Sequence, residues 1–354
     1  MKDNQPNDIN FNQISTEEKS RLKRKIENSV FAYAQKKRRR KYAIGFAAAS
    51  IILLFSVGLL FDYSKQDVSP IETFVNASKD VIKTEEVKLI LGDAKNIEIT
   101  EENSAITYSD NGQNVSIGNS KLVNQNVGTS KDVVFNTLIV PYGKRSEIVL
   151  ADGSKVWLNS GTKLIFPATF LEGNREVYLD GEAIFEVKHN RNQPFIVKSK
   201  DQDIEVLGTV FNVSNYKDDD AVLTVLKSGS IKLHYTTDNF MSSQSELKIA
   251  PNTLATYHKK AKQIKTTTVE VETYFSWRDG VFIFRNDPLK TIMKKLSRYY
   301  DVEITINDND LANQSFSGYL DVSQDLEHVM QIIKEAESAQ FDYKLTSNKK
   351  LIIN

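Results

Sequence analysis

The sequence predicts a membrane-anchored, mainly β protein that ends in a small α+β module. Three observations predict this fold class. One apolar stretch, Tyr42 to Phe61, contains no charged residue; residues 135–272 alternate short β-rich segments with turn residues; and residues 273–354 alternate strand and helix patterns. The 354-residue chain has no cysteine, so packing has to hold this fold without disulfides.

The apolar stretch reads YAIGFAAASIILLFSVGLLF, 20 residues in all. A helix of this length spans about 30 Å, the hydrocarbon thickness of a bilayer. The basic run Lys36 to Lys41, KKRRRK, precedes it and Asp62 follows, so the positive-inside rule predicts a cytoplasmic N-terminus and an external C-terminal bulk. A cleaved secretory signal is disfavoured because the leader has 41 residues and no small-x-small site follows the apolar core.

Formal net charge is zero, but the two sides of this stretch carry opposite signs. Residues 1–41 hold 12 Lys and Arg against 5 Asp and Glu, whereas residues 62–354 hold 34 against 41. A basic inner tail suits anionic lipid or an acidic protein surface, and the acidic external part disfavours direct nucleic-acid binding.

In the tail, residues 1–41, the first 14 residues are polar and are predicted to be disordered. Ser15-Thr16-Glu17-Glu18 fits a capping box that opens a basic helix. One apolar stripe then recurs at helical spacing: Leu22, Ile26, Val30. A single stripe cannot bury itself, so it needs a protein partner or the membrane surface, and the pattern leaves both open.

Residues 62–134 are predicted to form a spacer and an accessory β region. The part up to about residue 85 is polar and contains Pro70. Four short β-rich segments follow: Val87 to Leu91, Asn96 to Thr100, Ala105 to Tyr108, Asn114 to Gly118. They form either a small subregion of their own or strands added to the next domain.

Residues 135–272 are predicted to form a β-sandwich or barrel-like domain. Strand candidates recur roughly every 8 to 12 residues. They are Asn136–Val140, Ser146–Leu150, Lys155–Leu158, Lys163–Phe166, Arg175–Leu179, Ala183–Val187, Phe195–Lys198, Ile204–Leu207, Val210–Asn215, Ala221–Lys227 and Ser230–Tyr235. Predicted turns are Asp152-Gly153, Asn159-Ser160-Gly161, Asp180-Gly181 and Ser228-Gly229. Alternation predicts buried pairs: Val156 with Leu158, Val177 with Leu179, Phe185 with Val187.

Residues 273–354 are predicted to form a module in the order β-α-β-β-α-β, with one more strand closing a final hairpin. Asn286-Asp287-Pro288 is predicted to cap the first helix. The apolar faces of the two helices are Leu289, Ile292, Met293 and Leu296, and Leu326, Val329, Met330 and Ile333. The pattern predicts a compact α+β module with two helices on one sheet, of a size that can fold alone.

Catalytic, cofactor and metal sites are not expected. The four histidines have no metal-ligand spacing. Asp218-Asp219-Asp220 lacks the glycine and the distal glutamate of a calcium loop and is interpreted as a solvated hairpin, while Trp157 and Trp277 are interpreted as core residues.

The pair Gly208-Thr209 can be interpreted in two ways. A threonine hydroxyl can attack the preceding carbonyl and open the chain if that peptide bond is strained, which would be self-cleavage. The alternative is structural, because a glycine in a strand pattern marks a bulge or close packing.

Several external motifs carry a family resemblance. They are GKRSEIVLADGSKVWLNSGTKLIFP from Gly143, REVYLDGEAIFEV from Arg175, PFIVKS from Pro194, VLGTVFNV from Val206 and LKSGSIKL from Leu226. Together they resemble the periplasmic domain of FecR-type transmembrane anti-sigma regulators. The run from Trp277, WRDGVFIFRNDPLKTIMKKLSRYYDVEI, is similar to the C-terminal module of many members, whose fold resembles the secretin and TonB N-terminal signalling domain.

The resemblance implies a single-pass inner-membrane anti-sigma factor with a cytoplasmic N-terminus and a periplasmic C-terminal bulk. Such a protein relays the state of a TonB-dependent outer-membrane transporter to an extracytoplasmic-function sigma factor. Many members have a longer cytoplasmic helical domain than the 41 residues here. The alternative function is a tethered periplasmic ligand- or glycan-binding β module without a sigma partner.

Two surfaces are candidates for these partners. The stripe Leu22, Ile26 and Val30 would face the sigma factor. A free strand edge is a template for an added strand, so the segment from Gln314 to Leu320 would meet the transporter's signalling domain. The edge candidates are Gln314, Phe316, Gly318 and Leu320.

Overall fold

The computed structural model describes residues 15–63, 69–78, 84–100, 105–118, 121–127, 133–238, 244–335, 341–346 and 348–354. The chain divides into two compact units, one ending at Val68 and one comprising Ser69–Asn354. The second unit contains both hydrophobic cores described below, so we expect it to fold without the first. The prediction of disorder for residues 1–14 lies outside the described residues.

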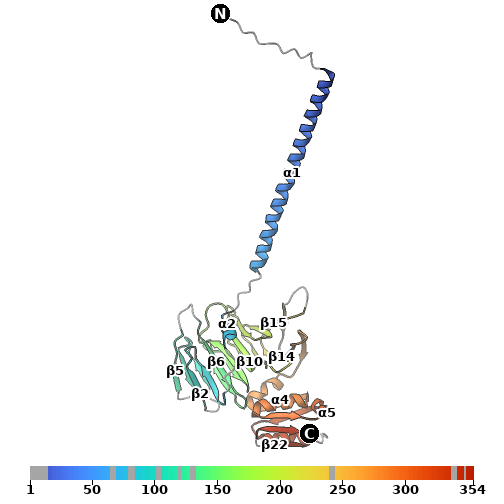
Figure 1. Ribbon diagram of the computed structural model, residues 1–354. Helices are drawn as coiled ribbons and strands as arrows, with labels where there is room; N and C mark the ends of the chain where they lie inside the picture. The colour runs from blue at the N-terminus through green and yellow to red at the C-terminus, as the bar shows by residue number, and fades with distance from the viewer. Residues whose placement is uncertain are drawn as a thin grey trace. The chain divides into compact units, whose positions relative to one another are not determined.

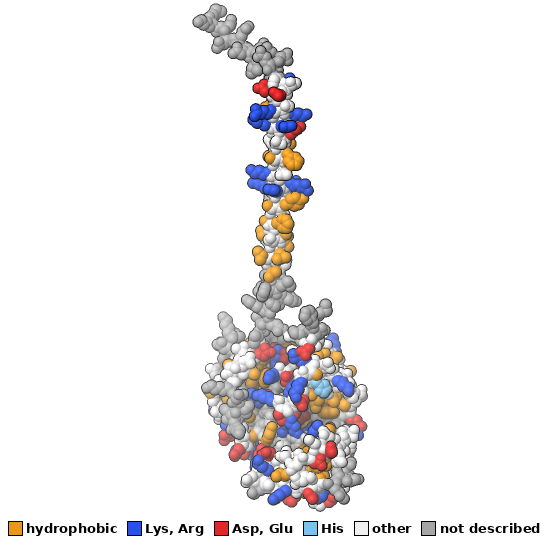
Figure 2. Space-filling model, turned by 45° about the vertical axis from the view of Figure 1, so that its right-hand side comes forward, with side chains coloured by type: hydrophobic (Ala, Val, Ile, Leu, Met, Phe, Trp, Pro, Cys, Tyr) orange, Lys and Arg blue, Asp and Glu red, His pale blue; other side chains and the backbone are white. Residues whose placement is uncertain are grey.

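The described part of the first unit forms one helix, α1 (Thr16–Tyr63). The predicted capping box is confirmed, because the amide of Glu18 donates to Ser15 Oγ at 3.2 Å and the amide of Ser15 donates to Glu18 Oε2 at 3.3 Å. The basic helix and the apolar stretch are continuous, with Lys and Arg gathered on the first part and apolar side chains on the second (Figures 1 and 2). Among the described residues, this is the one helix long and apolar enough to cross a membrane.

In the described residues of the second unit, 18 strands form one continuous curled sheet (Figure 1). The strands are β1 (Val87–Ile90), β2 (Asn96–Ile99), β3 (Ile106–Tyr108), β4 (Asn114–Ile117), β5 (Lys121–Asn124), β6 (Phe135–Val140), β7 (Ser146–Val149), β8 (Lys155–Leu158), β9 (Thr162–Pro167), β10 (Arg175–Glu186), β11 (Phe195–Lys198), β12 (Gln202–Val206), β13 (Val210–Asn215), β14 (Ala221–Ser228), β15 (Ile231–Thr236), β16 (Gln244–Ile249), β17 (Thr253–His258) and β18 (Gln263–Thr268). This confirms the prediction of a membrane-anchor candidate followed by a mainly β region.

The long strand β10 joins two halves of this sheet. Its first part pairs with β9 and, in parallel, with β11; its second part pairs antiparallel with β8 and β13. The predicted turn at Asp180-Gly181 is therefore wrong. The backbone continues through Gly181 at a φ of 122°, where a Cβ would lie 2.5 Å from Thr162 Oγ1. Glycine is required here because the strand passes from one half of the sheet to the other against a close neighbour.

The accessory strands belong to the same sheet. β1 pairs with β6, and β3 pairs in parallel with β7. The segment interpreted as a spacer contains a helix, α2 (Pro70–Ala77), whose Ile71 is buried and whose Phe74 ring lies 5.1 Å from that of Phe135. Lys198 Nζ lies 3.0 Å from Glu72 and also pairs with Asp203. The chain is thus fixed to the β domain from α2 onward.

A single apolar core lies between the two halves of the sheet. Every predicted buried pair is confirmed: Val156 and Leu158, Val177 and Leu179, Phe185 and Val187. Phe185 stacks on Phe211 at a ring-centroid distance of 5.1 Å. Strand alternation therefore located this core correctly.

The C-terminal module follows a short helix and a 3-10 turn, α3 (Glu272–Phe275) and η2 (Ser276–Asp279). Its elements are β19 (Val281–Pro288), α4 (Leu289–Tyr300), β20 (Glu303–Ile306), α5 (Asn309–Asn313), β21 (Ser315–Asp321), α6 (Leu326–Glu335), β22 (Tyr343–Thr346) and β23 (Lys350–Ile353). Both predicted helix faces are buried.

Three details of the module differ from the prediction. A short helix, α5, is inserted, capped by Asp308. The strands form two sheets, β19-β21 and β20-β23-β22, rather than one. Asn286 and Asp287 do not cap α4; they form an irregularity in β19, with Asn286 at a φ of 57°, and the amide of Arg285 donates to Asp287.

Candidate interaction surfaces and the domain junction

The C-terminal module packs on the outer face of the β domain. Ile184 on β10 and Val225 on β14 are fully buried and belong to the apolar cluster of the module rather than to the core of the β domain. Trp157, Val210 and Leu254 pack against the same cluster. Trp157 therefore lies at the junction, not in the core as predicted. The core interpretation of Trp277 is confirmed, because Trp277, in the η2 turn, is buried in the apolar cluster of the module.

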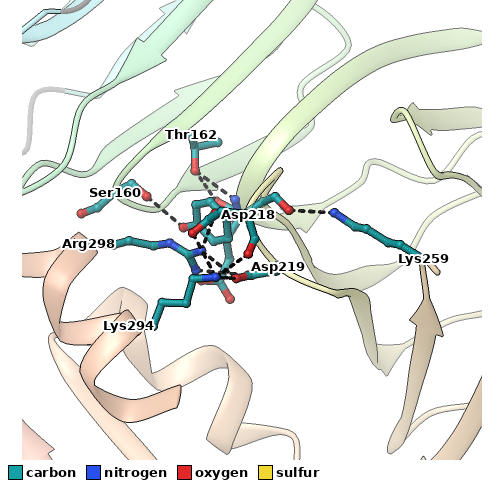
Figure 3. Close-up of polar contacts among 9 residues, drawn as sticks. Ser160, Thr162, Asp218, Asp219, Lys259, Lys294 and Arg298 are labelled. Atoms are coloured by element: carbon teal, nitrogen blue, oxygen red, sulfur yellow. Dashed lines mark hydrogen bonds and ion pairs between the residues drawn. The ribbon is translucent and has the colours of Figure 1, made fainter. Parts of the chain in front are cut away.

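An arginine clamp joins the two domains across this junction (Figure 3). Arg298 on α4 is only 7% exposed, and its guanidinium binds Asp219 through two contacts, Nη2 to Oδ1 at 2.7 Å and Nη1 to Oδ2 at 3.2 Å. Nη2 also donates to Asp218 at 2.8 Å. Paired contacts of this kind are both strong and geometrically specific.

Further contacts hold the clamp in place. The guanidinium lies 3.6 Å from the centroid of the Tyr216 ring, and the Tyr216 hydroxyl donates to the carbonyl of Ser160 at 2.8 Å. Lys294 on α4 approaches Asp219 at 2.6 Å and Asp218 at 3.0 Å. The acidic run does lie in the turn between β13 and β14, and Asp218 stays half exposed, so the hairpin interpretation is confirmed. The run is not merely solvated, however, because Asp218 and Asp219 both bind cations across the interface.

Three more contacts cross the junction away from the clamp. Arg145 donates to the carbonyl of Trp277 at 2.8 Å, Arg278 lies 5.1 Å above the Trp157 ring, and Lys227 pairs with Glu272 at 2.7 Å. A cavity of about 30 Å³ remains between the domains. It is too small for anything beyond a few water molecules.

A larger open groove of about 1050 Å³ runs beside the clamp. Its lining includes Lys217, which lies 3.3 Å from Asp180, and Lys349, which lies 2.7 Å from Asp301. Cations and carboxylates of the lining thus pair with one another, and the groove presents no field of one sign that would select a charged ligand.

Charge pairing shifts the pKa values of the clamp. Burial alone would raise the pKa of Asp218, but the hydrogen bond from Lys294 and the charge of Arg298 outweigh it and lower that pKa. Hydrogen bonds to Asp219 and Asp218 raise the pKa of Lys294 against the opposing effect of burial. The charged forms of Asp218 and Lys294 therefore stabilise each other.

These shifts predict a pH-dependent contribution to stability. Because the folded-state pKa of Asp218 is lowered, its contribution is present above the unfolded value of about 3.9 and is lost as the pH falls through the folded value. We expect the free energy of unfolding of wild type to exceed that of Asp218→Asn by about 1 kcal/mol or less at pH 6, since Asp218 is half exposed. The difference should shrink as the pH falls below about 3.9 toward the folded-state pKa. Urea unfolding of residues 69–354 between pH 3 and 7 measures it; Asp110→Asn, in an exposed turn, is the control. A gap that did not shrink between pH 6 and pH 3 would contradict the assignment.

The structure places the predicted sigma-facing stripe on one exposed face of α1. Leu22, Ile26 and Val30 are 57%, 55% and 62% exposed. No described residue covers them, so this face is free to take a partner, and whether a sigma factor is that partner stays a prediction.

The predicted partner edge corresponds to β21. It pairs with β19 on one side, and no described strand pairs with its other side. Phe316 and Leu320 point into the module core, whereas Gly318 is open and Tyr319 is 68% exposed. Gln314 lies outside the strand, as the residue that ends α5. An added strand would therefore meet the backbone of this edge and the side chain of Tyr319.

Gly208 and Thr209 lie beside an irregularity between β13 and β14. A Cβ on Gly208 would lie 2.6 Å from His189 Cα, and Thr209 is buried with Oγ1 donating to the carbonyl of Ser230 at 3.1 Å. The bulge and close packing expected of this glycine are both present.

No group of His, Cys, Asp or Glu among the described residues could hold a metal ion.

Sequence reasoning missed the clamp because its parts are about 80 residues apart. The one available signal is charge complementarity, an acidic run after β13 and the basic α4 face of Lys294 and Arg298. That signal does not say which oppositely charged segments meet.

Comparison with known proteins gives consistent matches. Residues 136–232 match the family described as FecR protein, and residues 281–353 match the family described as FecR, C-terminal. Two crystal structures of a proposed anti-sigma factor from Parabacteroides distasonis ATCC 8503 are similar, each with a TM-score of 0.55 and 25% sequence identity over 62% of this chain and 98% of that chain. No curated protein sequence matches.

Proposed function

Because the chain belongs to the FecR-type family of anti-sigma regulators, we propose that it relays an external signal through its apolar helix to an extracytoplasmic-function sigma factor. The observation that carries this proposal is the order of parts along the chain: an exposed apolar stripe, a helix able to cross a membrane, and the two FecR domains. In this proposal the signal comes from the signalling domain of a TonB-dependent outer-membrane transporter.

The charge of α1 supports a cytoplasmic N-terminus in the inner membrane, with the second unit in the periplasm. Lys36 to Lys41 directly precede the apolar part of the helix, and the positive-inside rule retains such a run in the cytoplasm. Residues 69–354 then face the outer membrane, where a transporter's signalling domain would be accessible.

The stripe on α1 supports direct contact with the sigma factor. An amphipathic helix binds by laying its apolar face in a groove of the partner. We expect Leu22→Asp or Ile26→Asp to weaken binding at least tenfold, because each would bury a carboxylate in that groove. The measurement is co-purification of residues 1–41 with the sigma factor encoded nearest to the gene, followed by titration.

Asn28→Asp is the matched control, because it adds the same charge on the face opposite the stripe. Equal losses in all three variants would point to a general charge effect. Binding unaffected by Leu22→Asp and Ile26→Asp would remove the stripe from the interface, and lack of binding by the wild-type tail at micromolar concentration would move the output to the membrane surface or to another subunit.

The second candidate, a glycan- or ligand-binding β module, has less support. Aromatic platforms for sugars have to be exposed along a sheet face. Trp157, the tryptophan on a β-domain strand, lies under Arg278 and against the C-terminal module instead. The clustered surface that such a module would need is therefore occupied by another part of the chain.

We propose no catalytic step for the relay. Self-cleavage at Gly208-Thr209 would require Thr209 Oγ1 to turn from the carbonyl of Ser230 toward that of Gly208. The packing of Gly208 against His189 supports the structural interpretation of this pair, and self-cleavage stays an untested hypothesis.

A further inference from the structure

The junction joins two domains that the sequence presents as separate. Relative motion is the default for domains that share a small polar interface, whereas a large apolar one restricts it. Here the module covers Ile184 and Val225, both fully buried, and Arg298 is held between a carboxylate pair and an aromatic ring. Separation would expose apolar surface and break paired contacts at the same time.

A backbone hydrogen bond also joins the two domains at the junction. The amide of Gly143, in the turn after β6, donates to the carbonyl of Arg298 at 2.9 Å. At the far side of the β domain, α2 is packed on β9 and β10 through Ile71 and bound through Glu72. A continuous set of packed elements therefore runs from β21 through α4 and the sheet to α2.

We propose that the C-terminal module, the β domain and α2 move as one rigid body, with Arg298 as the residue that positions the module, so that a partner strand on β21 displaces α2 without opening the junction. This inference rests on the proposed relay for its role in signalling. The rigidity itself can be measured without any partner.

Both tryptophans of the chain report on the junction. Trp157 contacts Arg278, and Trp277 is 5% exposed beside the module. Intrinsic tryptophan fluorescence therefore reports whether the module is docked on the β domain, whereas far-ultraviolet circular dichroism reports the unfolding of all strands. For residues 69–354 we expect the two signals to change at one thermal midpoint in wild type. In Arg298→Ala, the fluorescence change should come at least about 5 °C earlier, because the module undocks first.

A disulfide can lock the junction, since the chain has no cysteine to interfere. A Cβ at Gly143 would lie 3.3 Å from Asp301 Cβ, slightly less than the roughly 3.5 to 4.5 Å between bonded cysteines. The positive φ of Gly143, 77°, adds strain that the reduced form carries equally. The pair Gly143→Cys and Asp301→Cys, added to Arg298→Ala, should restore a single midpoint when oxidised. The reduced form of the same protein is the control for the two substitutions.

The outcomes decide the inference. The inference would be overturned by two thermal midpoints in wild type, or by a single midpoint in Arg298→Ala carrying the reduced cysteine pair. If Arg298→Ala does not fold, it is replaced by Arg298→Lys, which keeps the charge and loses the paired donors.

The role of the junction in signalling is tested in cells that carry a sigma-dependent reporter and the transporter. There the oxidised cysteine pair, in an otherwise wild-type chain, should leave reporter induction within about twofold. Loss of induction only in the oxidised form would mean that the junction opens. No induction by wild type would overturn the proposed relay instead, and the midpoints would still decide rigidity.

Discussion

Gly181→Ala is expected to destabilise the β domain by about 3 to 5 kcal/mol, enough to remove most of the stability of an ordinary domain. Gly181 has a φ of 122°, and a Cβ there would lie 2.6 Å from Thr162 Cα, so backbone strain and overlap act together. Thr162 cannot move away because it pairs with Val140 across β6 and β9. Urea unfolding of residues 69–354, followed by circular dichroism, measures the loss.

Gly173→Ala is the matched control. Gly173 also has a positive φ, 103°, but a Cβ there would have no atom within 4 Å. We expect a cost of about 1 to 2 kcal/mol from strain alone. If Gly181→Ala cost no more than Gly173→Ala, the close approach of β10 to Thr162 would not be what requires glycine.

Gly181 also illustrates the limit of local sequence signals. An Asp-Gly pair between two β-rich runs is a strong hairpin signal, and Asp152-Gly153 does form a tight turn, with Gly153 at a φ of 84°. Asp180-Gly181 has the same sequence but lies within a continuous strand, β10, that joins the two halves of the sheet. The deciding contact, Thr162, is about 20 residues away, so no local pattern contains it.

Elements with strong periodicity could be predicted, and elements without it could not. The face of α4 repeats apolar residues at helical spacing and was located residue by residue. By contrast, β18 reads QIKTTT and is almost wholly exposed, so it lacks the alternation that marks a half-buried strand. Residues that form ion pairs, such as Arg298 and Asp219, do not recur at a regular spacing in the sequence. The contacts at the junction could therefore be identified only from the structure.

Strand geometry shows which backbone amides of β21 face its free side. Backbone amides in an antiparallel pair point alternately toward and away from the partner strand. The amide of Val322 donates to the carbonyl of Gly280, on the β19 side. Counting back by two from Val322, the amides of Leu320 and Gly318 face β19. The amides of Asp321, Tyr319 and Ser317 then face outward, where a partner strand would add, and Tyr319 is the middle one of the three.

Tyr319→Pro is therefore expected to abolish binding of the transporter's signalling domain, and with it sigma-dependent reporter induction, while the module stays folded. Proline removes the outward amide and is tolerated at a free edge, so it blocks an added strand without breaking the β19-β21 ladder. Tyr319→Ala, which keeps the amide, separates the backbone from the side chain and should retain part of the binding. Gly318→Pro should instead destabilise the module, because its amide faces β19. Retention of the signalling domain by Tyr319→Pro at wild-type affinity, measured by pull-down and titration with a thermal midpoint close to that of wild type, would rule out strand addition at β21 and leave the side-chain surfaces of the module as its means of recognition.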